Sequence, residues 1–144
     1  MDSQTPEIDK LFEGKLSKNV VFTPKNIVND MLNILPNEVW NKDTKFLDPA
    51  CKGGEFLIKI IDRLKIKLAD EFNSEEELEE HILNNQIYGL AMSDFLSALT
   101  QTRIYGEMDS TRNIQTLDIS KITSKQLYSP SIIKPFYKAR LFPL

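Results

Sequence analysis

The chain has 144 residues, a length typical of one compact domain, so a two-domain organisation is not expected. Hydrophobic residues make up 41% and charged residues 27% of the sequence, which matches a folded globular protein and excludes the sparse-core composition of a disordered chain. No apolar run reaches the roughly 18 to 20 residues of a membrane-spanning helix, and the N-terminus lacks the basic start and apolar core of a secretion signal. The composition therefore predicts neither membrane insertion nor secretion.

Cysteine usage and charge narrow the class of protein further. Cys51 is the single cysteine, which excludes an intramolecular disulfide and a cysteine-based zinc site, and a lone thiol predicts a cytoplasmic protein. The net charge of −3 gives no overall electrostatic reason to expect nucleic-acid binding. The residues after Asp118 nevertheless carry a charge of +5, against −8 for residues 1–118. This basic tail is either an ordinary surface or an edge that contacts phosphates.

The first predicted helix begins after an N-terminal arm at residues 1–19, which forms either a short helix or a loose segment. Thr23 is placed to cap a helix whose first residue is Pro24, and Pro36 ends the segment. Apolar residues repeat between them at helical spacing and predict one buried stripe. They are Ile27, Val28, Met31, Leu32 and Leu35.

The remaining elements alternate between strands and helices. A short apolar run ending at Asp48 predicts a strand, and a helix follows from residue 56 to about residue 72. Ser74 and Glu77 form a capping box for an acidic third helix, and residues 86–92 predict a second strand. Ser93 or Asp94 then caps a helix that ends at Gly106, and residues 113–119 predict a third strand. This order predicts an open α/β domain with a parallel sheet and helical crossovers.

The sequence FLDPACKGGEF lies where open α/β sheets bind ligands, directly after a strand and before a helix. Gly53 and Gly54 allow a close approach of the backbone, and the following helix N-terminus favours polar or anionic groups. Asp48 ends the strand and can accept hydrogen bonds from an ammonium group. The residues alone leave two interpretations open, a site for a nucleotide-like ligand and a tight structural turn.

Three segments together resemble a known family. FTPKNIVNDML, FLDPACKGGEFLIKIIDRL and IYGLAMSDFLSALTQTRIYG follow one another over about residues 20–120. They resemble motifs X, I and II of the restriction–modification type adenine-N6 DNA methyltransferases. The resemblance implies a partial Rossmann-like fold of the S-adenosylmethionine-dependent methyltransferases, incomplete at the C-terminus. Residues 20–144 would be its cofactor-binding part.

The resemblance also implies functional residues. Motif X corresponds to Phe22, Thr23 and Pro24, which would line the cofactor. Motif I corresponds to Asp48, Pro49, Ala50, Cys51, Gly53, Gly54 and Phe56, which would surround its methionine portion. Asp118 matches the motif III acid, expected near the adenine ring. Five of these residues have a structural alternative: Thr23 and Pro24 can form a plain helix cap, Phe56 a core contact, Cys51 a small buried loop residue and Asp118 a surface acid.

The sequence departs from the family pattern at two positions around the cofactor motifs. The family places an acid two residues after the motif II glycine to hold the ribose hydroxyls, but Gly89 is followed by Leu90 and Ala91. Asp94 is a substitute for that acid unless it serves only as a helix cap. Lys52 replaces the first glycine of the motif I loop, which is tolerable only if that position does not require a positive φ.

The catalytic Asn/Asp-Pro-Pro-Tyr/Phe motif of the family does not occur in the sequence. Lys134-Pro135-Phe136-Tyr137 is only weakly similar to it, because lysine cannot accept the hydrogen bonds of the target amine. We therefore expect the S-adenosylmethionine-binding portion of a restriction–modification or phage adenine-N6 DNA methyltransferase, without catalytic residues of its own. DNA would be bound through a missing C-terminal part or a partner chain. The alternative is an inactive truncated module that acts by self-association or by completing a partner, and a methyltransferase for protein or small molecules also remains open.

Two aromatic residues have structural explanations. His81 is the only histidine and lies among glutamates of the third helix, so a metal site is not expected and a solvated helix position is. Trp40 follows the first helix and is expected to pack rather than to stack on a base. An incomplete sheet has exposed edges, which predicts self-association of the chain.

Overall fold

The computed structural model describes residues 21–109 and 112–117. The expectations for the N-terminal arm, Asp118, the segment Lys134 to Tyr137 and the basic tail lie outside these residues. The helices are α2 (Lys25–Asn33), α3 (Glu55–Leu68), α4 (Glu75–Asn85) and α5 (Asp94–Tyr105), with short 3-10 turns η1 (Asn37–Val39) and η2 (Ala69–Glu71). The strands are β1 (Phe46–Asp48), β2 (Ile87–Ala91) and β3 (Ile114–Thr116).

The three strands form one parallel sheet in the order β1-β2-β3. Phe46 pairs with Ile87 and Asp48 with Gly89, and Gly89 also lies beside Ile114. The connection from β1 to β2 runs through α3 and α4, and the connection from β2 to β3 runs through α5. The predicted open α/β fold with a parallel sheet and helical crossovers is therefore confirmed, as a partial Rossmann-like arrangement.

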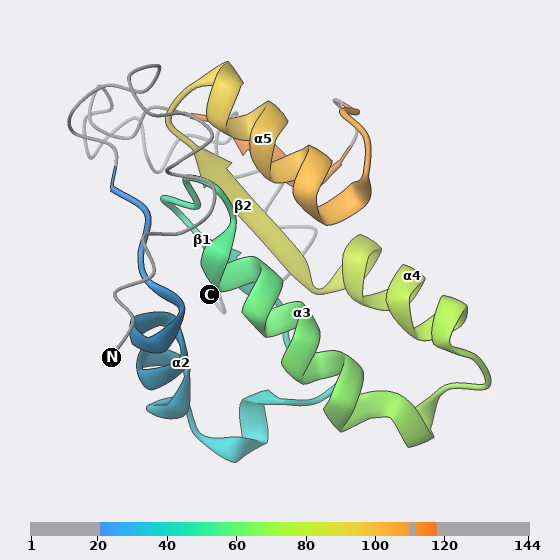
Figure 1. Ribbon diagram of the computed structural model, residues 1–144. Coiled ribbons are helices and arrows are strands. Elements are labelled where there is room, and N and C mark those ends of the chain that lie inside the picture. The colour runs from blue at the N-terminus through green and yellow to red at the C-terminus, as the bar shows by residue number, and fades with distance from the viewer. Residues whose placement is uncertain (1–20, 110–111, 118–144) are drawn as a thin grey trace, which may run out of the picture.

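One helix of each crossover, α3 and α5, covers the same face of the sheet, and α4 lies beside α3 near the start of β2 (Figure 1). Two right-handed crossovers that step in the same direction place their helices on one side. The core lies between these layers, where Leu57 of α3 and Ile114 of β3 are fully buried. A Cβ atom on Gly89 would lie 2.9 Å from Ile114 Cδ1 and 3.0 Å from Leu57 Cδ1, so glycine at this position lets α3 approach the sheet closely.

Helix ends on α4 and α5 follow the predicted capping signals. The backbone N–H of Glu77 donates to Ser74 Oγ at 3.1 Å, although the Glu77 carboxylate accepts from the backbone of Asn73 rather than from Ser74. Ser93 caps α5, because its Oγ accepts from the N–H of Leu96 at 3.2 Å. Gly106 ends α5 in the left-handed conformation, with φ +77°. The capping choice left open between Ser93 and Asp94 is thus settled in favour of Ser93.

Two expectations for the first helix were wrong. Pro24 is the N-cap of α2 and Lys25 its first residue, and the Thr23 side chain makes no capping hydrogen bond. The helix begins one position later than expected, because the carbonyl of Pro24 accepts the first intrahelical hydrogen bond, from the N–H of Val28, and the proline side chain at the N-cap has no acceptor to offer. The predicted apolar stripe is also split, since only Val28 and Leu32 are buried.

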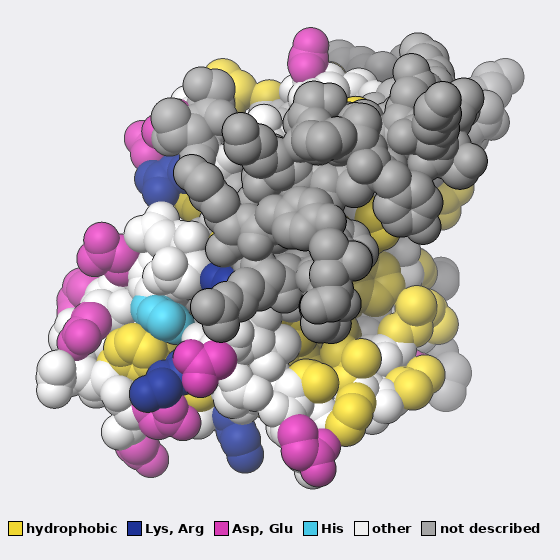
Figure 2. Space-filling view, turned by 180° about the vertical axis from the view of Figure 1, so that it is seen from behind, with side chains coloured by type: hydrophobic (Ala, Val, Ile, Leu, Met, Phe, Trp, Pro, Cys, Tyr) yellow, Lys and Arg dark blue, Asp and Glu magenta, His cyan; other side chains and the backbone are white. Residues whose placement is uncertain are grey.

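The other apolar residues of α2 and the turn after it face solvent. Figure 2, which shows the molecule from behind, has a gathering of hydrophobic side chains at its lower right, over the region of α2. The exposed residues are Ile27 at 43%, Met31 at 51%, Ile34 at 82% and Leu35 at 38%. Among the described elements, α3 packs on α2 and does not cover these side chains, so α2 presents an exposed apolar side.

Trp40 packs as expected, whereas His81 lies on α4 but is half-buried against Phe72 rather than fully solvated. Trp40 stacks on Phe46 with ring centroids 5.3 Å apart, and the Arg63 guanidinium lies 5.5 Å from the Trp40 ring. His81 Nε2 lies 2.9 Å from the carbonyl oxygen of Lys42. Within residues 21–109 and 112–117, no cluster of three histidine, cysteine or acidic side chains is placed to hold a metal ion. No helix of this part of the chain has the length and apolar character needed to cross a membrane.

Candidate functional site

The segment after β1 leaves the sheet for two residues and then returns to it. Asp48 Oδ1 accepts a hydrogen bond from the backbone N–H of Ala50 at 3.0 Å, which turns the chain back at Pro49 and Ala50. The N–H of Cys51 then donates to the carbonyl of Leu90 at 3.0 Å. Pro49 and Ala50 are exposed, whereas Cys51 is 2% exposed and belongs to the core. The loop of residues 51–54, called the glycine loop below, therefore starts from a point fixed to β2.

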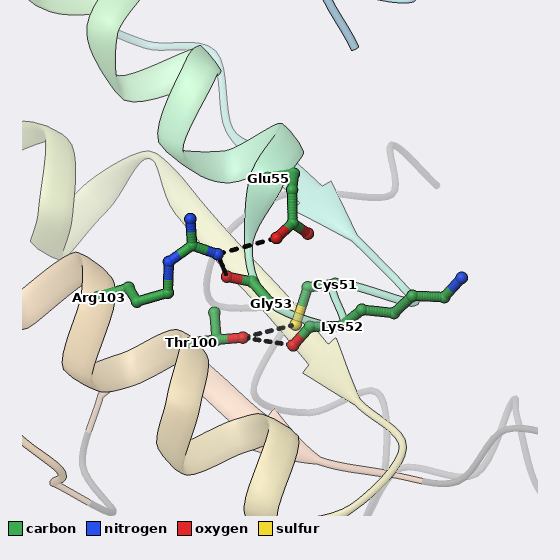
Figure 3. A network of polar contacts seen from close by, with 6 residues as sticks. All are labelled: Cys51, Lys52, Gly53, Glu55, Thr100 and Arg103. Carbon is green, nitrogen blue, oxygen red and sulfur yellow. Dashed lines mark hydrogen bonds and ion pairs between the residues drawn. The ribbon is translucent and has the colours of Figure 1, made fainter. Parts of the chain in front are cut away.

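The carbonyl groups of the glycine loop are tied to α5. Thr100 Oγ1 donates to the carbonyl of Lys52 at 2.7 Å, and Arg103 Nη1 donates to the carbonyl of Gly53. The same Arg103 nitrogen forms an ion pair of 2.8 Å with the carboxylate of Glu55, the first residue of α3 (Figure 3). Two side chains one helical turn apart on α5 thus hold two successive peptide groups of the loop.

The glycine loop contains a strained residue where the family pattern has a glycine. Lys52 has φ +40°, so the condition on which its substitution for glycine was tolerable is not met. Side chains other than glycine enter this region at a cost of about 1 kcal/mol or more. The Lys52 ammonium donates to the carbonyl of Val21 at 2.7 Å, a contact that glycine could not make and that offsets part of the cost.

Replacing Lys52 separates the backbone strain from this contact. Both Lys52→Gly and Lys52→Ala lose the hydrogen bond to Val21, but only alanine keeps the strained φ. We expect the glycine variant to have a free energy of unfolding about 1 kcal/mol higher than the alanine variant, measured by urea denaturation. Equal stability of the two variants would show that the position carries no strain.

The segment before α2, which corresponds to motif X, lies against the glycine loop. A Cβ atom on Gly53 would lie 2.7 Å from Phe22 Cε1 and 2.6 Å from Glu55 Oε1, so both side chains pack directly on Gly53. Phe22 is 1% exposed and part of the core, Thr23 is half-buried and Pro24 is exposed. Phe22 and the glycine loop, about thirty positions apart in sequence, therefore meet at Gly53.

Burial shifts the pKa values of Asp48 and Cys51, the two titratable groups at the start of the loop. Burial raises the pKa of Asp48 above its ordinary value, and the nearby Glu55 carboxylate adds to the effect. The hydrogen bond from Ala50 and the charge of Lys52 act in the opposite direction. Among the described residues, no cationic side chain forms an ion pair with Asp48. A desolvated carboxylate at the end of a strand is a group that gains from an external cation.

Cys51 is not a nucleophile. Burial raises the pKa of its thiol to about 12, so the thiolate is not populated near neutral pH. Its sulfur lies 3.9 Å from Thr100 Oγ1 inside the core. The interpretation of Cys51 as a small buried loop residue is confirmed.

Comparison with known proteins identifies the family. Residues 12–134 match the family model described as N-6 DNA Methylase. The chain belongs to the N-6 DNA methylase family. It is 32% identical over 108 residues to a protein of Mycoplasma pneumoniae named an uncharacterized adenine-specific methylase. The match covers 72% of this chain and 25% of that protein, so the chain spans about a quarter of the length of the relative.

The N-6 DNA methylase match includes all the motif residues named from the sequence. Asp118 lies within the matched range but outside the described residues. Phe56 packs against the core, as its structural alternative states. Asp94 is exposed and lies three positions after the last residue of β2, and the capping role that offered a structural explanation for it belongs to Ser93.

Sequence reasoning missed Thr100 and Arg103 as neighbours of the glycine loop. The signal was present in α5, because Ser97, Thr100 and Gln101 are polar residues that repeat at helical spacing and are all buried. Polar side chains on the inner face of a helix indicate buried hydrogen-bond partners. The sequence did not reveal that the partner of Thr100 is a loop carbonyl about fifty residues earlier, and Arg103, which is exposed, carried no such signal.

Proposed function

We propose that this chain binds S-adenosylmethionine, as the cofactor-binding portion of a restriction–modification or phage adenine-N6 DNA methyltransferase. The observation that carries the proposal is Asp48, a desolvated carboxylate at the end of β1 that has no ion-pair partner among the described residues. It lies just before the glycine loop, whose carbonyl groups accept hydrogen bonds from Thr100 and Arg103 of α5. The cofactor ends in an ammonium and a carboxylate, and Asp48 provides the complementary group for the first.

The hydrogen-bond donors of this site also fit the carboxylate of the cofactor. The N-terminus of α3 has no side-chain cap, so its first backbone N–H groups and the positive end of its dipole are available to an anion. The negative charge of Glu55 disfavours anion binding here, but Arg103 forms an ion pair of 2.8 Å with this carboxylate and offsets its charge. Asp48 would hold the ammonium, and the glycine loop with the first turn of α3 would hold the carboxylate. The bound cofactor would supply an activated methyl group.

The remaining proposed contacts surround the other parts of the cofactor. Asp94 would accept hydrogen bonds from the ribose hydroxyls, because it is exposed and is the first acid after β2. Phe22, Thr23 and Pro24 would line the site, and Asp118 would lie near the adenine ring. The motif I residues Pro49, Ala50, Cys51, Gly53, Gly54 and Phe56 would shape the pocket around the methionine portion.

The family assignment supports DNA as the substrate and adenine as the target base. The Mycoplasma pneumoniae relative is named as adenine-specific, and about three quarters of its length lies outside the match. DNA recognition and catalysis would depend on residues beyond those described or on a partner chain. We propose that the protein acts in the cytoplasm, where DNA and cofactor are both present.

Calorimetric titration with S-adenosylhomocysteine tests the proposal. We expect saturable binding to the intact chain, and a preference for adenosine over 2′-deoxyadenosine as competitor. Asp94→Asn should remove that preference and lower affinity for S-adenosylhomocysteine about tenfold, because a carboxylate accepts hydroxyl hydrogen bonds more strongly than an amide. Binding that leaves the preference intact in the variant would refute the role of Asp94.

A folded chain without any cofactor binding would refute the proposal and favour the alternative, a module that acts by self-association or by completing a partner. The exposed apolar side of α2 is the observation that favours this second candidate. Light scattering distinguishes the outcomes, because a binding-inactive module that self-associates would show a mass that rises with concentration.

A further inference from the structure

We propose that Arg103 and Thr100 of α5 are positioning residues, which hold the glycine loop in the conformation that receives the methionine portion of the cofactor. This inference rests on the proposed function. Neither residue was among the expected contacts, and both act through the backbone of the loop rather than on a ligand.

The hydrogen bonds fix three successive carbonyl groups of the loop. The carbonyl of Cys51 accepts from the N–H of Gly54, that of Lys52 from Thr100 and that of Gly53 from Arg103. In a trans peptide the C=O and the following N–H point in opposite directions. Turning the Lys52 carbonyl toward α5 therefore turns the Gly53 N–H away from α5. The two side chains determine which way the polar groups of the loop point.

Burial makes the Thr100 contact hard for water to replace, whereas the Arg103 side chain is 31% exposed and is held by its ion pair with Glu55. Thr100 is fully buried, and Glu55, the carboxylate that anchors Arg103, has a side chain only 11% exposed. Figure 3 shows Arg103 and Thr100 reaching the loop from the same side, with Glu55 on the far side of the Arg103 guanidinium. Loss of Thr100 would leave the carbonyl of Lys52 without its donor, and loss of Arg103 would free the carbonyl of Gly53 and the carboxylate of Glu55 together, so either change favours another conformation of the loop.

Arg103 also compensates a charge beside the proposed ammonium site. The Glu55 carboxylate already contributes to raising the pKa of Asp48. Without Arg103 its charge would be unpaired next to the N-terminus of α3, where the carboxylate of the cofactor is proposed to bind. Removing Arg103 should therefore weaken the binding of the amino-acid portion more than that of the adenosine portion.

The test compares two ligands on the intact chain by calorimetry. S-adenosylhomocysteine contains both portions, and 5′-methylthioadenosine contains the adenosine portion alone. We expect Arg103→Met to lower affinity for the first by at least about tenfold and for the second by less than about twofold. Arg103→Lys should restore affinity for S-adenosylhomocysteine to within about threefold of wild type, since an ammonium can donate to both acceptors.

Thr100→Val provides a second variant that removes only the hydroxyl group. Its matched control is Thr102→Val, because Thr102 Oγ1 donates to the carbonyl of Ala98 on the exposed side of the same helix. Thr100→Val is expected to show the same ligand-selective loss, and Thr102→Val to bind both ligands like wild type. The melting temperature of each variant, measured without ligand, verifies that it is folded.

Each outcome decides between the two proposals. If the wild type binds both ligands and the folded Arg103→Met and Thr100→Val variants bind S-adenosylhomocysteine equally well, the positioning role is overturned and the proposed function stands. An equal loss of affinity for both ligands in these variants would also overturn it, since this indicates a general structural effect. A folded wild type that binds neither ligand overturns both proposals.

Discussion

Asp48→Asn is expected to lower the affinity for S-adenosylhomocysteine by about 10- to 100-fold without destabilising the chain. The loss corresponds to one charge-assisted hydrogen bond to the ammonium, worth roughly 1.5 to 3 kcal/mol. The asparagine Oδ1 can still accept the N–H of Ala50, which lies 3.0 Å from Asp48 Oδ1, so the turn after β1 keeps its hydrogen bond. A variant that keeps its stability and loses its ligand is the signature of a residue retained for binding.

Asp48 is expected to make the folded chain less stable as the pH rises, which is the opposite of the usual effect of an acidic residue. Burial raises the pKa of Asp48 in the folded chain above its ordinary value of 3.8, so the folded state holds this proton more tightly than the unfolded state does. The stabilisation from Asp48 is fully present below pH 3.8 and is lost as the pH rises through the raised value. Above that pH range the buried ionised carboxylate lowers the free energy of unfolding, and Asp48→Asn removes this destabilisation.

Urea denaturation from pH 3.5 to 7 and calorimetry at pH 7 measure both effects. The free energy of unfolding of Asp48→Asn should gain on that of the wild type as the pH rises through that range. Asp43→Asn is the matched control, because Asp43 is exposed and lies before β1 rather than after it. Unchanged ligand affinity in Asp48→Asn, or a loss of similar size in Asp43→Asn, would contradict the role given to Asp48.

Gly54→Ala is expected to cost about 2 to 3 kcal/mol of stability and to abolish measurable cofactor binding. Gly54 has φ +84°, a conformation that alanine adopts at a cost of about 1 to 2 kcal/mol. The added Cβ would also lie 3.0 Å from Thr100 Cγ2, so the buried Thr100 would have to shift away from the loop. That shift threatens the hydrogen bond from Thr100 to the carbonyl of Lys52.

Gly106→Ala separates the backbone cost from the steric one. Gly106 has φ +77°, and a Cβ atom placed there would meet nothing within 4 Å. We expect this variant to lose about 1 kcal/mol and to bind S-adenosylhomocysteine like wild type. Thermal denaturation and calorimetry on both variants measure the difference, and equal losses of stability would mean that Thr100 adapts to the new Cβ without strain.

The order of elements was predictable because local signals are strong in this chain. Ser74 and Ser93 begin helices where their side chains can cap, and Gly106 ends α5 where a left-handed residue is required. Helix ends without such signals were less accurate. The helix expected to reach about Phe72 ends at Leu68 and is followed by the η2 turn. Of the strand predicted at residues 113–119, the described part, 113–117, is a strand only at Ile114–Thr116.

What sequence reasoning could not supply depends on long-range packing. Ile27 and Val28 are equally apolar neighbours, yet one is 43% exposed and the other fully buried, because α3 covers only one side of α2. The left-handed backbone of Lys52 has no local signature, since lysine does not favour it. The Arg103 contact with Gly53 joins residues fifty positions apart. Periodicity identifies a face of a helix, but not the neighbour that covers it.

The hydrogen bonds between α5 and the glycine loop bear on how the molecule opens locally. Hydrogen exchange reports opening in cooperative units, and segments joined by buried contacts open together. Thr100 and Arg103 join the loop to α5, and Gln101 of the same helix donates to the carbonyl of Ile114 in β3. The loop, α5 and β3 would then exchange as one unit. A ligand held at the loop would then slow amide exchange in β3 as well as in the loop.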